Sequence, residues 1–203
     1  MSNKPLIVFE GVEGSGKSYH IKSVSNYLKK KKIGHILIRE PGGTKNAEKI
    51  RNLILNRKSN FNQNTDLFLY LASRSENIDI IQKNYRKKII LIDRFIDSTT
   101  AYQHYGFGID LKLINLLNDY LLNNIKIDLT FLNIVNSKNM LLRIKKRKKL
   151  NRYDTFKFDF YRKVQRGFLK LSKNKKKKYI IINSNLDQNY NKSIITKNLD
   201  KII

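Results

Sequence analysis

The 203-residue chain contains no cysteine, which excludes disulfide bonds and thiolate metal sites. It also lacks any run of about 18 apolar residues, so we expect no membrane span. The opening residues MSNKPLIVFEG are unlike a signal peptide. No stretch rich in proline, glycine or serine divides the chain, and its length suits one domain over residues 1–203. These absences predict a single-domain protein of the cytoplasm.

Acidic residues are also scarce, since 16 Asp and Glu stand against 42 Lys and Arg, and the formal charge is +26. Such a surface could bind a polyanion such as nucleic acid. The lysines, however, lie in runs at 29–32 and 173–178 and are not interleaved with aromatic residues. Lys, Asn and Ile are abundant together, as A/T-rich codons would produce. We interpret the charge as compositional and expect no specific nucleic-acid partner.

Apolar runs of strand length recur along the chain. They are continuous rather than alternating, which is typical of strands buried on both faces of a parallel sheet. The five runs are residues 6–9, 35–38, 89–92, 129–135 and 179–182.

Helical patterns lie between these runs. Ile21, Val24 and Leu28 are three and four residues apart, as on one face of a helix. Asp110 suits the N-cap of another helix. The apolar face expected for that helix consists of Leu113, Ile114, Leu117, Tyr120 and Leu121. The alternation of strand and helix predicts an α/β fold of three layers, a five-stranded parallel sheet flanked by helices.

Residues 11–18, GVEGSGKS, fit the pattern G-x-x-x-x-G-K-[ST] at every fixed position. The pattern follows a predicted strand, and a helix should begin near Lys17. Glycines let backbone N–H groups converge on an anion, and the helix N-terminus adds positive potential. Lys17 can reach the β- and γ-phosphates, and Ser18 can ligate Mg²⁺. The predicted nucleoside triphosphate site consists of Gly11, Val12, Glu13, Gly14, Ser15, Gly16, Lys17 and Ser18.

A second polar site is predicted where the run at 89–92 ends, at Asp93 and Arg94. The Asp93 carboxylate can hold the Mg²⁺ shell through water, although a surface salt bridge is the alternative. An ATPase coupled to motion needs no arginine here, whereas an enzyme with a second anionic substrate does. A guanidinium matches phosphate oxygens bidentately. Arg94 therefore favours an enzyme with two phosphate-bearing substrates.

Four further stretches resemble motifs of the bacterial thymidylate kinases, in the order and spacing of that family. They are REPGGT at 39–44, LYLASR at 69–74, DRFIDSTTAYQ at 93–103 and GFGID at 106–110. The resemblance implies the P-loop nucleotide kinase fold and a transfer of the γ-phosphoryl group of ATP to dTMP with Mg²⁺. It also implies a homodimer and makes Glu40–Pro41 a candidate cis peptide.

The resemblance also implies roles for single residues, by matching position. Arg39 and Arg94 would hold the dTMP phosphate. Glu13 would approach the 3′-hydroxyl group and the metal.

The base and sugar would be bound by a second group of matching residues. Tyr70, in place of the family's phenylalanine, would stack on thymine. Arg74 and Thr99 would hydrogen-bond the base. Tyr102 would lie near C2′ and disfavour a ribose, and Gln103 would complete the pocket.

Residues 143–154, RIKKRKKLNRYD, resemble the family's lid, which we place at about 143–155. A cation delivered by a lid stabilises the charge that develops in phosphoryl transfer. In the family this cation lies either in the phosphate loop or in the lid. Since Ser15 stands at the loop position, the resemblance implies that the lid supplies the cation, and Arg147 aligns best. Lys17, Arg94 and Arg147 are thus the expected catalytic residues.

Two alternatives stay open from the sequence. One is another pyrimidine nucleotide or deoxynucleoside kinase on the same scaffold. The other is a basic nucleic-acid-binding P-loop ATPase, which predicts ATP hydrolysis stimulated by DNA or RNA. Arg94 together with Thr99, Tyr102 and Gln103 is not explained by this second alternative.

Overall fold

The computed structural model describes residues 3–174 and 178–203, so the lysine run expected at 173–178 lies partly outside the described residues. Five parallel strands form one sheet in the order β2-β3-β1-β4-β5. Each strand begins where a predicted apolar run begins, which confirms the predicted sheet. The strands are β1 Leu6–Glu10, β2 His35–Arg39, β3 Ile89–Asp93, β4 Leu129–Ile134 and β5 Tyr179–Asn183.

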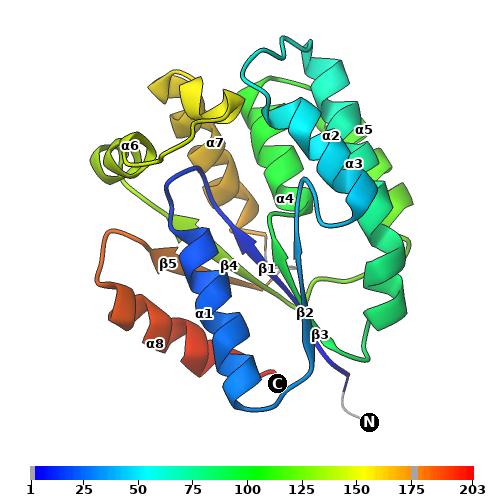
Figure 1. Cartoon of the computed structure of the whole chain (residues 1–203), viewed down its shortest axis with the longest axis vertical. Coiled ribbons are helices and arrows are strands. Elements are labelled where there is room, and N and C mark those ends of the chain that lie inside the picture. Colours follow the sequence, from blue (N-terminus) through cyan, green and yellow to red (C-terminus); the bar gives the residue numbers. More distant parts are fainter. Residues whose placement is uncertain (1–2, 175–177) are drawn as a thin grey trace.

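Helices cover both faces of the sheet (Figure 1), which makes the three layers that the sequence predicts. Helices α1 (Lys17–Lys30) and α8 (Gln188–Leu199) pack on one face. The remaining helices are α2 Lys45–Leu55, α3 Gln63–Asn84, α4 Ile96–Thr99, α5 Leu111–Leu122, α6 Ser137–Lys145 and α7 Phe158–Leu171. A π-helical segment, η1 (Thr100–Gly106), continues α4, and a short 3₁₀ helix, η2 (Arg152–Thr155), follows α6.

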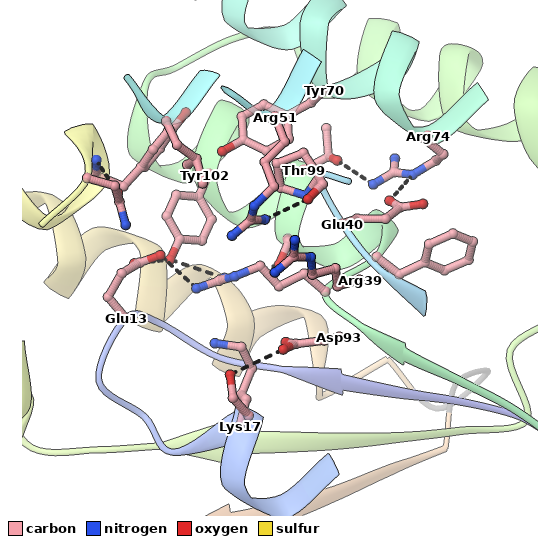
Figure 2. A pocket seen from close by; sticks show the side chains of 18 of the residues that line it. Glu13, Lys17, Arg39, Glu40, Arg51, Tyr70, Arg74, Asp93, Thr99 and Tyr102 are labelled. Carbon is pink, nitrogen blue, oxygen red and sulfur yellow. Dashed lines mark hydrogen bonds and ion pairs between the residues drawn. The ribbon is translucent and has the colours of Figure 1, made fainter. Parts of the chain in front are cut away.

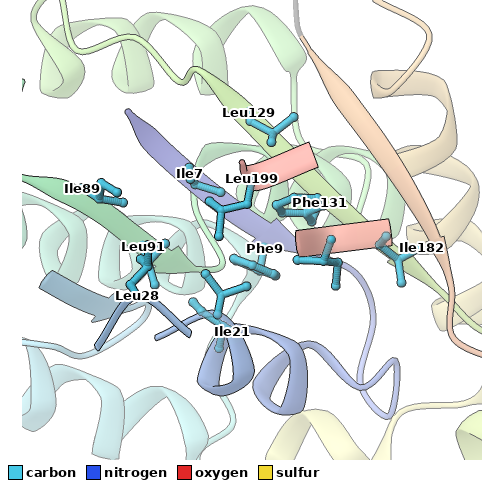
Figure 3. Packing of buried hydrophobic residues seen from close by; sticks show 12 residues of the cluster. Ile7, Phe9, Ile21, Leu28, Ile89, Leu91, Leu129, Phe131, Ile182 and Leu199 are labelled. Atoms are coloured by element: carbon cyan, nitrogen blue, oxygen red, sulfur yellow. The ribbon is translucent and has the colours of Figure 1, made fainter. Parts of the chain in front are cut away.

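The central strand β1 sends its side chains alternately into two hydrophobic cores. Ile7 and Phe9 pack with α1 and α8 on one face (Figure 3), and Leu6 and Val8 pack with α3 on the other. All four side chains are at most 1% exposed. Burial on both faces explains the continuous apolar run, because each such side chain contributes about 1.5–3 kcal/mol. The sheet is thereby held as a rigid base for the loops at its carboxyl edge.

The expectation of burial on both faces is wrong for the two edge strands. Leu37 in β2 is 50% exposed and Ile181 in β5 is 48% exposed. An edge strand has a neighbour on one side only, so part of its surface stays in solvent.

The apolar face expected for α5 is also partly wrong, because Leu113 is 38% exposed and Tyr120 is 81% exposed. The buried positions are Ile114, Asn118 and Leu122, each four residues after the last. The central residue of this buried stripe, Asn118, is polar. The spacing of apolar residues in the sequence therefore did not predict which face of α5 is buried. The expected N-cap is confirmed, since the Asp110 side chain accepts a hydrogen bond from Lys112 N.

Within residues 3–174 and 178–203, no helix has both the length and the apolar character needed to span a membrane.

Candidate active site

A cavity of about 210 Å³ opens at the carboxyl edge of the sheet (Figure 2). Figure 2 shows Lys17 and Asp93 at one end of it and Tyr70 and Arg74 at the other. The other predicted site residues belong to the loop at 11–16. Twelve of the predicted site residues line the cavity: Glu13, Lys17, Ser18, Arg39, Tyr70, Arg74, Asp93, Arg94, Thr99, Tyr102, Gln103 and Arg147.

The phosphate loop, residues 11–16, joins β1 to α1, and its carbonyl groups accept hydrogen bonds from the Lys17 side chain. Gly11 has φ 139°, and a Cβ there would lie 2.2 Å from the Asn133 carbonyl oxygen, so no larger residue fits. Lys17 is 6% exposed, and its Nζ donates to the carbonyl oxygens of Gly11 at 2.7 Å and Val12 at 3.1 Å. Burial, and then the charge of Arg94, lowers the pKa of Lys17 to about 7. An anion in the loop would restore full charge to this lysine.

Ser18 and Asp93 are brought together from the start of α1 and the end of β3. The Ser18 hydroxyl donates to Asp93 Oδ2 at 3.3 Å. Oxygen ligands suit Mg²⁺, which keeps several waters and usually binds substrate phosphates as well. In the described part of the chain, no group of three His, Cys, Asp or Glu residues could hold a metal ion. A cation at this place would complete its coordination with water and with oxygens of a bound nucleotide.

Arg94 lies between the phosphate loop and the rest of the cavity. Its φ is 67°, a left-handed conformation that is uncommon outside glycine and concentrated at functional sites. The guanidinium donates to the Gly11 carbonyl at 2.9 Å and pairs with Glu13 at 2.7 Å. The Tyr102 hydroxyl donates to the other Glu13 oxygen. Burial favours the neutral acid, but the charges of Arg94 and Lys17 hold the pKa of Glu13 below its usual value.

Arg74 in α3 is fixed deep in the far end of the cavity. It is 2% exposed, and each of its three guanidinium nitrogens donates to a different side chain. Nε reaches Glu40 at 2.8 Å, Nη1 reaches Asn118 at 2.6 Å, and Nη2 reaches Thr99 at 3.0 Å. Glu40 precedes the cis peptide to Pro41, as the sequence suggested. These partners hold Arg74 and Thr99 in one orientation.

Aromatic rings and one amide complete this end of the cavity. The ring of Tyr153 meets those of Tyr70 and Tyr102 edge-on, with centroids 6.0 and 5.8 Å apart. Gln103 in η1 is fully buried, and among the described residues neither of its amide atoms has a hydrogen-bond partner. A buried amide without partners is costly, so Gln103 is available to a polar ligand.

Arg39 and Arg51 bring two more cations to the cavity. Arg39 is the last residue of β2, its side chain is 55% exposed, and it pairs with Glu48 at 2.8 Å. Arg51 in α2 donates to the Pro41 carbonyl at 2.6 Å, and the sequence analysis missed it. The sequence could have indicated Arg51 by its position, because it lies two helical turns after Thr44, the N-cap residue that ends REPGGT. A cation there faces the same edge of the sheet as Arg39.

The three lid arginines point in different directions. Arg147 lines the cavity and pairs with Asp154. Arg143 donates to the carbonyl oxygens of Gly14 at 3.0 Å and Ser184 at 2.6 Å, so it ties α6 to the phosphate loop. Arg152 is buried against α3. Of the three, Arg147 is the one that lines the cavity.

The fold and the cavity define a class of protein: a P-loop nucleotide kinase, with a phosphate loop facing an arginine-lined pocket across the sheet edge. The family model described as thymidylate kinase matches residues 9–195. The chain belongs to the thymidylate kinase family. The P-loop nucleotide kinase fold expected from the resemblance is thereby confirmed.

Individual relatives cover nearly the whole chain. A thymidylate kinase of Thermosipho africanus is 39% identical over 178 residues, which are 87% of this chain and 88% of the relative. One from Sulfurihydrogenibium is 38% identical over 90% of both chains. A crystal structure of thymidylate kinase from Ehrlichia chaffeensis superposes with a TM-score of 0.79 at 32% identity, covering 98% of this chain and 99% of the other.

Proposed function

We propose that this protein transfers the γ-phosphoryl group of ATP to dTMP and yields dTDP and ADP. The observation that carries the proposal is the position of Arg94. Its guanidinium bonds the phosphate loop at Gly11 and lies beside Tyr102 in the pocket, 5.3 Å from the ring centroid. One cation can therefore reach a phosphate on each side of it.

The acceptor phosphate is bound by Arg94 and Arg39, and we add Arg51. A dTMP phosphate takes the place of Glu13 as the partner of Arg94, because a dianion attracts the guanidinium more strongly than a carboxylate does. Glu13 is then free to accept a hydrogen bond from the 3′-hydroxyl group. Tyr102, which holds Glu13 in place, lies near C2′ and disfavours a ribose.

The thymine base is read at the far end of the pocket. Tyr70 stacks on the ring. Arg74 and Thr99, already fixed to each other, hydrogen-bond the carbonyl and N3–H groups. Gln103 offers the remaining donor and acceptor.

The reaction is an in-line displacement. A phosphate oxygen of dTMP forms a bond to the γ-phosphorus, and the bond between that phosphorus and the β-bridging oxygen breaks, so ADP leaves. No covalent enzyme intermediate is required, because the phosphate is itself the nucleophile. Lys17, Arg94 and Arg147 offset the repulsion between the two anions and the charge of the transition state.

Ser18 and Asp93, the latter through water, are the residues that would hold Mg²⁺ beside the ATP phosphates. When bound, the ion neutralises charge on the β- and γ-phosphate oxygens.

The proposal is tested by an assay of ADP release with MgATP and a panel of nucleoside monophosphates. We expect dTMP to be the preferred acceptor, dUMP to be weaker and the ribonucleotides to be poor. A Lys17→Ala sample purified in parallel should be inactive, which controls for contaminating kinases. Equal turnover of all pyrimidine monophosphates would contradict the base pocket. ATP hydrolysis that DNA or RNA stimulates, without transfer to any monophosphate, would favour the basic P-loop ATPase.

A homodimer is the second part of the proposal, with α3 and α5 as the contact face. These two helices pack on each other and expose Phe68, Leu116 and Tyr120, which are 54%, 67% and 81% exposed. Two copies of a chain with charge +26 repel each other, so a contact needs a face with little net charge. The exposed charges of α3 and α5 nearly cancel: Glu76, Asp79, Asp119, Lys83 and Lys112.

Light scattering after gel filtration tests the dimer. We expect a mass of twice the chain for the wild type and a shift to monomer for Leu116→Lys. A wild-type monomer at micromolar concentration would contradict this part. The cytoplasmic location stays a prediction of the sequence.

A further inference from the structure

A buried ion pair joins the lid to helix α3. Arg152 in η2 donates through Nη2 to Oδ1 of Asp66, in the first turn of α3 and 86 residues away in the chain. Asp66 is 3% exposed and Arg152 is 8% exposed. The hydroxyl of Tyr153 donates to the other Asp66 oxygen at 3.4 Å. Asp66 lies outside the motifs that mark the active site, and neither Asp66 nor Arg152 lines the cavity.

Stability alone does not account for a pair that is this buried. Moving two charges out of water costs several kcal/mol for each ion, and a well-packed apolar pair is often as stable. The Nε of Arg152 is also buried without a hydrogen-bond partner among the described residues. What the pair does supply is a fixed distance between η2 and α3.

Helix α3 carries the acceptor pocket on the face that carries Asp66. Asp66, Tyr70 and Arg74 follow each other at intervals of four, so they stack along one side of the helix. Tyr70 and Arg74 line the cavity. The position of Asp66 is therefore set by the same helix that holds the acceptor base.

Arg147 is held by hydrogen bonds within the lid, between residues 147 and 154. Arg147 pairs with Asp154, whose side chain is fully buried, and the other oxygen of Asp154 accepts a hydrogen bond from Asn151 N at 2.9 Å. The Asn151 side chain in turn caps η2. Arg152 lies inside this closed turn, so Arg147 and Arg152 belong to one unit.

We propose that the Asp66–Arg152 ion pair positions Arg147 relative to the acceptor pocket. Asp66 and Arg152 are then positioning residues, which act on the reaction only through Arg147. The proposal rests on the proposed kinase function. It explains why two charges are retained in the core: they fix the lid cation from the helix that binds the acceptor, so that both are correctly placed for the same transfer.

Steady-state kinetics of a set of variants test this. Asp66→Asn and Arg152→Met should each lower kcat by roughly 10- to 100-fold, the effect of a displacement of about 1 Å in a catalytic group. The KM for ATP and for the acceptor should change by less than about threefold. The double variant should be no slower than the slower single variant, because both remove the same contact. Arg152→Lys, which keeps the charge, should recover part of the lost rate.

The decisive comparison uses the Arg147→Ala background. There the Asp66→Asn and Arg152→Met substitutions should lower kcat by less than about twofold, because the cation they position is gone. A purely structural role would lower kcat by the same factor in both backgrounds. That result, or an unchanged kcat in the wild-type background, overturns the proposal.

Arg86→Met is the matched control. It removes a partly buried ion pair with Asp128, 2.7 Å long, at the amino edge of the sheet, so it should lower Tm and leave kcat unchanged. The ratios are measured with whichever monophosphate the wild type turns over, so that failure with dTMP counts against the proposed substrate alone. Hydrogen exchange of residues 143–155 gives a readout without turnover. Asp66→Asn and Arg152→Met should speed exchange there and Arg86→Met should not, whereas unchanged exchange in all three contradicts the ion pair's role.

Discussion

The two ends of the active site are built in different ways. At the acceptor end, Arg74 is 2% exposed and has three side-chain partners from three different segments of the chain. At the donor end, the side chain of Arg147 is 36% exposed and pairs with one carboxylate, that of Asp154. The acceptor pocket is thus a continuation of the folded core, whereas the donor site is completed by a lid. Substitutions at the acceptor end should therefore affect folding and recognition together, whereas substitution of Arg147 should affect turnover more than nucleotide binding.

Removing the lid cation should produce the largest single effect. Arg147→Ala should lower kcat by about 10³-fold, since an arginine that stabilises the transferring phosphoryl group contributes on this scale. Affinities for both nucleotides, measured by calorimetry, should change little. Lys148→Ala, in an exposed neighbour, is the control and should keep full turnover. If Arg147→Ala keeps full turnover, another lid cation stabilises the transition state.

Removing the arginine at the acceptor end, Arg74, should lower both the stability of the protein and its affinity for dTMP. Arg74→Met leaves Glu40 buried without its ion pair, which should lower the free energy of unfolding by about 3–5 kcal/mol. Binding of dTMP should weaken in the same variant, while ATP affinity should be retained. Urea denaturation and calorimetry measure these quantities. A variant as stable as the wild type would show that the acceptor pocket is not part of the core.

A smaller effect on dTMP affinity is expected from substitutions of Tyr70. Two of them distinguish stacking by the ring from hydrogen bonding by the hydroxyl. Tyr70→Ala should raise the Kd for dTMP by roughly 10- to 100-fold, because base–aromatic stacking contributes about 1–3 kcal/mol. Tyr70→Phe keeps the ring and should bind dTMP nearly as the wild type does. Equal losses for Tyr70→Ala and Tyr70→Phe would mean that the hydroxyl, not the ring, contacts the nucleotide.

The smallest effect is expected on the pH dependence of stability and concerns Glu10, the last residue of β1. Glu10 accepts hydrogen bonds from Phe95 N at 2.8 Å and from the Ser98 hydroxyl at 2.5 Å. Burial, and then the charge of Asp97, raises the pKa of Glu10 from 4.5 to about 7. A raised pKa means that folding favours the protonated acid. The stability from this group is therefore full below pH 4.5 and is lost as the pH rises through about 7.

Glu10→Gln, which imitates the protonated acid, should remove this dependence. Thermal unfolding at about pH 5 and about pH 8 should give nearly equal Tm values for the two proteins at the lower pH and a higher Tm for Glu10→Gln at the higher pH. A difference between the two proteins that does not change with pH would show that Glu10 is ionised throughout.

The sequence predicted most of the fold because the fold is encoded locally. All five strands begin at the first residue of an apolar run, and α1 begins at Lys17 as expected. The exposed positions Leu37 and Tyr120 could not be foreseen, because the identity of the edge strands and the partner of α5 depend on packing between distant segments. Asn118 is the clearest case, since its burial follows from its bond to Arg74.

The site divides in the same way. Residues 11–18, Asp93 and Arg94 were found from their own sequence pattern, and the other predicted site residues from the resemblance to thymidylate kinases. Twelve of the predicted residues line one cavity. Arg51, Asn118 and Asp66 were missed, because each is defined by a partner far away in the chain. The pairing of Arg39 with Glu48 is likewise visible only in the folded protein.

The central claim is that Arg94 separates two phosphate sites, with the acceptor on the pocket side. A crystal structure with dTMP and a non-hydrolysable ATP analogue tests it most directly. We expect the dTMP phosphate on the guanidinium of Arg94, with Glu13 displaced from that guanidinium and the triphosphate in the loop at 11–18. Binding of dTMP at any other place, or with Glu13 still paired to Arg94, would contradict the claim.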